Sequence, residues 1–95
     1  MKSQPDLQDL PPGIAEARGE IDRIDAEIVR LLSVRLAIVM RAFQIKRAVG
    51  IPLRDEKREE QILERAAERA TELDLPRKQV RKIFRQILRI SAKSQ

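Results

Sequence analysis

Two cationic side chains, Arg35 and Lys46, occupy positions where the helical pattern of this chain calls for apolar residues. Apolar residues recur at helical spacing before and between them: Ile14, Ala17, Ile21, Ile24, Ile28, Leu31, Val39 and Ala42. Arg35 follows Ile28 by seven residues and Lys46 follows Val39 by seven. Their separation of eleven residues places them within about 20° of each other around the helix axis. Because an unpaired buried cation is costly, the pattern predicts an anionic partner, which is either a protein carboxylate or a bound ligand.

Two further helical patterns also carry polar residues at one end of their apolar stripes. Glu59, with Arg58 beside it, comes just before one stripe, and Ser91 and Gln95 follow Phe84 by seven and eleven residues. If the helices pack with these ends together, six side chains would form a hydrated, net-positive pocket: Arg35, Lys46, Arg58, Glu59, Ser91 and Gln95.

Each of these residues also has an ordinary structural interpretation. An arginine on an inner face can extend to solvent or pair with an acid such as Glu59, and residues near a helix end such as Ser91 and Gln95 often face water. Because polar residues occur at one end of the apolar stripe in all three helical patterns, we interpret the six residues together as a site for a small polyanion. Arg18 lies about 100° from the stripe, so the pattern alone places it among exposed surface charges.

Three helices are expected to position these side chains. The longest runs from about Ile14 to Val49 and ends at Gly50. Asp55 is expected to cap the second helix, and Pro76 to occupy the first position of the third. The apolar stripes of these two helices are predicted as follows: Ile62, Leu63, Ala66, Ala70 and Leu73, then Val80, Ile83, Phe84, Ile87 and Leu88.

The first helix is too long for the other two to cover. Its roughly 35 residues span about 50 Å, whereas the others have about 19 residues each. We therefore predict an all-α fold with three helices per chain, one of them very long, in a symmetric, intertwined homodimeric bundle. Residues 1–13 contain three prolines and no helical periodicity, so we interpret them as a flexible leader before a helical domain of residues 14–95.

Composition narrows the possible chemistry and location. The chain has no histidine and no cysteine, which excludes thiolate nucleophiles, imidazole bases and the usual transition-metal ligands. Its net charge of +5 arises from 20 Lys and Arg residues interspersed with 15 acids, a pattern typical of a mixed surface without nucleic-acid binding. There is no signal-peptide pattern and no apolar run near the ~20 residues that span a membrane. We therefore predict a cytoplasmic protein that binds neither nucleic acid nor membrane.

From Ile14 to Gln95, the sequence resembles the all-helical chorismate mutase family. The resemblance rests on five ordered segments, AEARGEIDRID, LLSVRLAIV, QIKRAVGIP, RDEKREEQIL and FRQILRISAKSQ. It implies the Claisen rearrangement of chorismate to prephenate in phenylalanine and tyrosine biosynthesis. This rearrangement within one molecule needs no nucleophile, metal or cofactor. It needs a compressed substrate conformer, and cations where negative charge develops on the ether oxygen.

The resemblance also implies a role for each matching residue. Arg18, supplied by the partner chain of the homodimer, would bind the substrate carboxylates together with Arg35, because guanidinium groups match carboxylates in shape. Lys46 and Gln95 would donate to the ether oxygen, so Lys46, Gln95 and Arg35 are the candidate catalytic residues.

Four further residues complete the implied site. Glu59 and the turn at Asp55 would hold the ring hydroxyl, Ser91 would contact a carboxylate, and Arg58 would support the site by its charge and by ordering Glu59. Two alternatives stay open. One is an isochorismate-pyruvate lyase on the same scaffold, which this chain resembles less in the Asp55–Arg58–Glu59 block. The other is a non-catalytic helical binding module.

Overall fold

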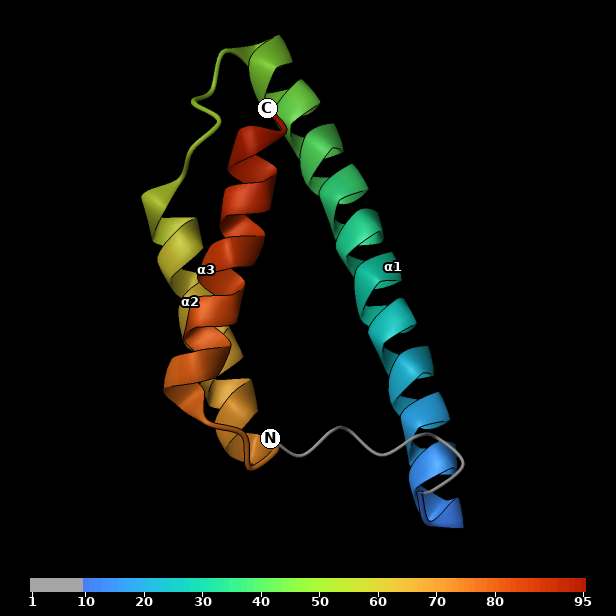
Figure 1. Ribbon diagram of the computed structural model, residues 1–95. Coiled ribbons are helices and arrows are strands. Elements are labelled where there is room, and N and C mark those ends of the chain that lie inside the picture. Colours follow the sequence, from blue (N-terminus) through green and yellow to red (C-terminus); the bar gives the residue numbers. More distant parts are fainter. Residues whose placement is uncertain (1–9) are drawn as a thin grey trace, which may run out of the picture. The chain divides into compact units, whose positions relative to one another are not determined.

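A computed structural model describes residues 10–95 of the chain, and its secondary structure is entirely helical. The three helices are α1 (Pro12–Val49), α2 (Glu56–Glu72) and α3 (Arg77–Lys93) (Figure 1). The predicted all-α fold with one very long helix is therefore confirmed. Contacts within the chain divide it into two compact units, which meet in α1 between Ser33 and Val34.

The N-terminal boundary of the first helix differs from the prediction. α1 begins at Pro12, so Pro12 and Gly13, which we expected in the leader, belong to the helix. Proline suits a first helical position because its missing N–H would have no intrahelical acceptor there. Leu10 and Pro11 precede the helix, and residues 1–9 of the predicted leader lie outside the described residues.

α1 ends in a Schellman motif centred on Gly50. The amide of Ile51 donates to the carbonyl of Lys46 at 2.9 Å, and the amide of Gly50 donates to the carbonyl of Arg47 at 3.3 Å. Gly50 has a φ of 74°, in the left-handed region where a Cβ is disfavoured. This turn directs the chain out of α1 and into the segment that leads to α2.

We expect Gly50→Ala to lower the free energy of unfolding by about 1 kcal/mol, because alanine is strained in the left-handed conformation. A Cβ at Gly50 meets no atom within 4 Å, so the whole cost is conformational. Urea unfolding at fixed protein concentration measures it. Gly19→Ala is the control, because Gly19 lies inside α1 and also has open space around it. It should raise stability by about 0.5–1 kcal/mol, and a stability gain at both positions would contradict the left-handed cap.

The two shorter helices begin with different caps. Asp55 caps α2 as predicted, because its Oδ1 accepts a hydrogen bond from the amide of Arg58 at 3.0 Å. Pro76 lies one position earlier than predicted. It is the N-cap residue of α3, since its ψ of 113° is extended, and its carbonyl accepts from the amide of Val80 at 3.1 Å.

α2 and α3 pack side by side and antiparallel (Figure 1). Ala67 of α2 is 0% exposed, and its carbonyl accepts a hydrogen bond from Arg77 of α3 at 3.2 Å. The buried apolar residues of α2 are Leu63, Ala66, Ala67 and Ala70. Leu73 and Ile83, which we predicted for the apolar stripes, are exposed. Leu73 is the residue that ends α2, and Ile83 points about 100° away from the half-buried Phe84.

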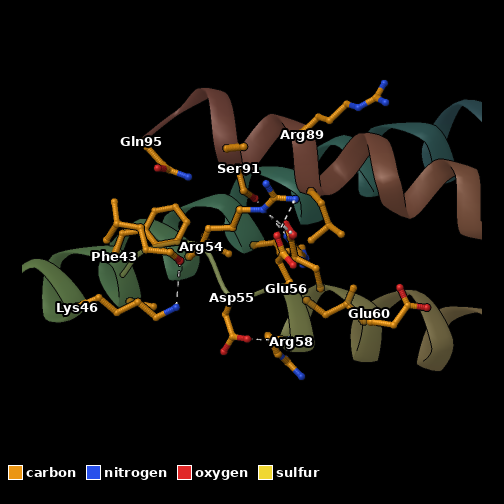
Figure 2. A pocket seen from close by; sticks show the side chains of 18 of the residues that line it. Phe43, Lys46, Arg54, Asp55, Glu56, Arg58, Glu60, Arg89, Ser91 and Gln95 are labelled. Carbon is orange, nitrogen blue, oxygen red and sulfur yellow. Dashed lines mark hydrogen bonds and ion pairs between the residues drawn. The ribbon is translucent and has the colours of Figure 1, made fainter. Parts of the chain in front are cut away.

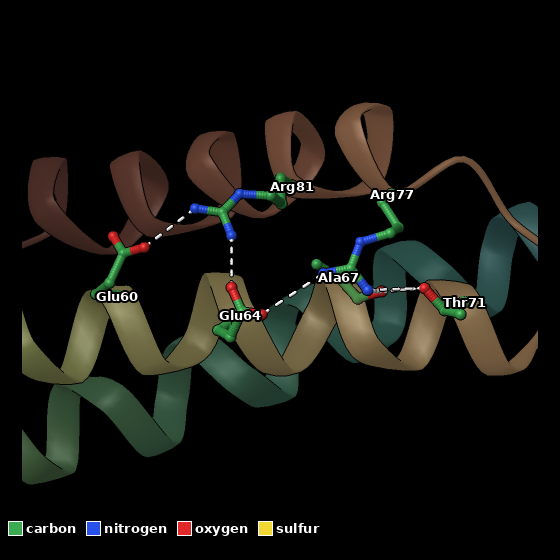
Figure 3. Close-up of polar contacts among 6 residues, drawn as sticks. All are labelled: Glu60, Glu64, Ala67, Thr71, Arg77 and Arg81. Carbon is green, nitrogen blue, oxygen red and sulfur yellow. Dashed lines mark hydrogen bonds and ion pairs between the residues drawn. The ribbon is translucent and has the colours of Figure 1, made fainter.

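Two arginines of α3 fix its register along α2 (Figure 3). Arg81 donates to Glu60 at 3.1 Å and to Glu64 at 2.9 Å. Arg77 donates to the hydroxyl oxygen of Thr71 at 2.7 Å. Because the helices are antiparallel, this register places the C-terminal end of α3 beside the N-terminal end of α2, where the polar residues of both helices occur.

The first part of α1 leaves its apolar stripe uncovered in a single chain. Five large side chains in the stripe are between 42% and 61% exposed: Ile14, Ile21, Ile24, Ile28 and Leu31. A row of exposed apolar residues along one helix face is typical of a surface that contacts another protein. Among residues 10–95, no helix is both long enough and apolar enough to cross a membrane.

Candidate functional site

Seven of the eight side chains identified from the sequence line one pocket in the unit Val34–Gln95 (Figure 2). The pocket has a volume of about 810 Å³ and is formed by the second half of α1, the segment before α2, the start of α2 and the end of α3. The seven residues are Arg35, Lys46, Asp55, Arg58, Glu59, Ser91 and Gln95. Arg18 is exposed and belongs to the other compact unit. The structure therefore gathers all the identified residues of this unit, although their roles stay predictions.

Arg35 extends from α1 to α3. Its Nη1 donates to Ser91 Oγ at 3.4 Å, and the buried Ser91 hydroxyl donates to the carbonyl of Ile87 at 3.5 Å. Burial lowers the pKa of Arg35, and the nearby positive charge of Arg58 lowers it further. Both effects disfavour the charged guanidinium, so an anion at this position would be stabilised by it and would stabilise it in return.

Lys46 reaches the pocket from the last turns of α1. Its Nζ donates to the carbonyl of Leu53 at 3.2 Å and lies 5.9 Å from the centre of the Phe43 ring. Phe43 is the buried residue of α1, so this contact places the ammonium group against an apolar wall. An ammonium group has three donors, and the contact with Leu53 leaves the others available to a ligand.

The pocket acids are engaged by groups other than the predicted cations. Arg54 Nε donates to Glu59 Oε1 at 3.2 Å, and Arg54 Nη2 lies 3.9 Å from Glu56 Oε1. The Asp55 carboxylate accepts a hydrogen bond from the backbone amide of Arg58, and Glu60 forms an ion pair with Arg81. The interpretation that Glu59 neutralises Arg35 is therefore wrong, because Glu59 pairs with Arg54 instead.

Among residues 10–95, the three pocket cations that the sequence analysis identified have no carboxylate partner. Within residues 10–95, no ion pair involves the side chains of Arg35, Lys46 or Arg58. Each lines the pocket beside acids that are already engaged. Unpaired cations around a cavity of this size favour the binding of a small anion.

Gln95 lies just beyond the end of α3. The helix ends at Lys93, and Ser94 follows as its C-cap with its amide donating to the carbonyl of Ser91 at 3.2 Å. The side-chain amide of Gln95 extends towards the pocket in Figure 2. The neutral side-chain amide of Gln95 therefore lines the same pocket as the cations.

Sequence reasoning missed three arginines that line the pocket: Arg54, Arg85 and Arg89. Arg54 directly precedes the Asp55 cap, and its place next to a predicted site residue was the sequence feature that could have identified it. Arg85 and Arg89 are four residues apart on one flank of the Leu88 stripe, so helical spacing could have found both. In Figure 2, the guanidinium of Arg89 points away from Ser91 and Gln95.

Comparison with known proteins gives three findings. Residues 17–95 match the family described as chorismate mutase type II. Over 52 residues, the chain is 38% identical to a protein named chorismate mutase from Methanocaldococcus jannaschii, a match that covers 55% of this chain and 52% of that protein. Over 52 residues, it is 42% identical to a bifunctional chorismate mutase/prephenate dehydratase from Aquifex aeolicus, covering 55% of this chain and 14% of that protein. The matches thus span about half or less of these relatives, and no solved structure matches the chain.

Proposed function

Because the chain belongs to the chorismate mutase type II family, we propose that it rearranges chorismate to prephenate in the pocket of residues 34–95. The observation that carries this proposal is that Arg35, Lys46 and Arg58, three of the cations around one cavity, have no carboxylate partner within residues 10–95. Chorismate carries two carboxylates, a ring hydroxyl and an ether oxygen, so it presents anionic and polar groups to such a wall. The rearrangement proceeds without a covalent intermediate, so a chain without histidine or cysteine can catalyse it.

In this proposal, catalysis is electrostatic. Arg35 binds a substrate carboxylate, with the Ser91 hydroxyl beside it. Lys46 and Gln95 donate to the ether oxygen, where negative charge grows as the C–O bond lengthens. A donor that is already in place, against the Phe43 ring rather than in open water, stabilises that charge more than water does.

In the same proposal, residues of the segment before α2 and of the first turn of α2 bind the substrate ring. The Glu59 carboxylate and the turn at Asp55 accept a hydrogen bond from the ring hydroxyl, which orients the substrate for the compressed conformer that reacts. Arg58 adds positive charge near Arg35, in line with its effect on the pKa of that residue.

We propose that Arg18 from a second copy of the chain completes the site. The exposed apolar stripe of α1 supports this pairing, because burying the exposed part of each large side chain contributes about 1 kcal/mol. A two-fold symmetric dimer would then contain two equivalent sites, each with Arg18 from the other chain. A cytoplasmic location, as part of phenylalanine and tyrosine synthesis, belongs to the same proposal.

The product formed by the purified protein tests this function. With chorismate, we expect loss of its ultraviolet absorbance and a single product identified as prephenate by NMR. With isochorismate, we expect little pyruvate. Faster release of pyruvate from isochorismate would favour the lyase, and binding without turnover of either compound would favour a non-catalytic module.

The pH dependence of Gln95→Glu tests the donor at residue 95. A neutral amide donates at any ordinary pH, so wild-type activity should vary little between about pH 5 and 8. A carboxyl group donates only while protonated, and a glutamate is normally ionised at neutral pH. The variant should therefore gain activity as the pH falls, as measured by initial rates. A flat profile at the wild-type level would show that residue 95 takes no part in the reaction.

A further inference from the structure

We propose that Arg54 is a positioning residue that holds the Glu59 carboxylate in place for the substrate, an inference that rests on the proposed function. Arg54 lies outside α2, just before its cap, and donates through Nε to Glu59 Oε1 at 3.2 Å. Both side chains line the pocket. Figure 2 shows Arg54 extending into the pocket rather than away from it.

Stabilisation of the fold does not account for this pair. The side chain of Arg54 is 72% exposed and that of Glu59 is 33% exposed, and exposed ion pairs contribute little to stability. α2 is already capped by Asp55. The contact therefore matters chiefly for where the Glu59 carboxylate points.

The unpaired cations explain why that orientation needs an anchor. Glu59 shares the pocket with Arg35 and Arg58, which have no carboxylate partner among the described residues. Without Arg54, Glu59 could rotate towards either of them and neutralise a cation that the substrate carboxylates require. Arg54 thus keeps Glu59 available for the ring hydroxyl and keeps the cations available for the substrate.

A double-mutant cycle with a matched control tests this role. We expect Arg54→Ala to lower kcat/KM by about 10- to 100-fold, the range seen when a reacting group is displaced slightly, with both a higher KM and a lower kcat. Arg89→Ala removes the same charge from the same pocket, but Arg89 has no ion pair within residues 10–95 and points away. It should cost less than about threefold, since exposed charges act weakly at a distance. Arg54→Lys, which keeps the charge, should recover most of the loss.

The decisive comparison is made in the Glu59→Ala background. If Arg54 acts through Glu59, adding Arg54→Ala there should cost less than about threefold. An equal loss in both backgrounds would overturn the proposal, because Arg54 would then act on the substrate itself. A loss no larger than that of Arg89→Ala would also overturn it. Unchanged thermal unfolding of all variants is the control for folding.

A measurement without substrate separates this inference from the proposed function. In ¹⁵N-labelled protein, the Arg54 Nε–Hε signal is identified by its absence in Arg54→Lys. We expect this signal to exchange with solvent more slowly in the wild type than in Glu59→Ala. Equal exchange in both proteins would overturn the pairing even if the protein converts chorismate. Failure to convert chorismate, with the exchange difference present, would overturn the proposed function and leave the pairing standing.

Discussion

Lys46→Ala is expected to lower kcat by about a hundredfold or more and to leave the protein folded. In the proposed mechanism, the variant lacks the cation that faces the developing negative charge on the ether oxygen, which corresponds to a loss of roughly 3 kcal/mol in transition-state stabilisation. In the folded protein, the Lys46 ammonium donates to one backbone carbonyl, that of Leu53, and one such bond from a charged group contributes about 1.5–3 kcal/mol. Initial rates with chorismate measure the first effect, and circular dichroism checks the second.

Arg47→Ala is the matched control for Lys46. Arg47 also lies in the last turn of α1 and carries the same charge, but it is exposed and is not among the residues that line the pocket. Its loss should change the rate less than about threefold, since exposed charges are screened by salt. A folded Lys46→Ala protein with a rate like that of Arg47→Ala would show that Lys46 is a structural or surface cation.

The second large effect is complementation between two inactive variants. Arg18→Ala and Lys46→Ala should each be nearly inactive alone, and refolding them together in equal amounts should restore about a quarter of wild-type activity. Half of the dimers are then mixed. In a mixed dimer, one of the two sites has its own Lys46 and receives Arg18 from the partner, whereas the other site lacks both groups.

Mixing the folded variants without refolding is the control for this experiment, because exchange between stable dimers is slow. Activity after refolding that equals the average of the two variants would mean that each site is built within a single chain. The shared-site dimer would then be wrong, whatever reaction the protein catalyses.

Features set by local sequence could be predicted. The Asp55 cap depends on one side chain and the next turn of helix, and the long α1 depends on uninterrupted periodicity. The approach of Arg35 and Ser91 was also predictable in outline, because both continue an apolar stripe that must face the interior.

Contacts could not be predicted where one side chain has several possible partners. Three arginines share the pocket with Glu59: Arg54 before α2, Arg58 within α2 and Arg35 on α1. Only the conformation of the segment before α2 brings Arg54 to Glu59. The burial of Ala67 was missed for a similar reason. An alanine gives a weak periodic signal, and its burial depends on contacts between elements, such as that of Arg77 with its carbonyl.

The most direct test of the central claim is a crystal structure with a bicyclic ether dicarboxylate that mimics the transition state. We expect its ether oxygen to lie at about 2.8–3.2 Å from Lys46 Nζ, one carboxylate to contact Arg35, and the other to contact Arg18 of a second copy of the chain. A ligand bound away from Lys46 and Arg35, or one held entirely by a single chain, would contradict the account.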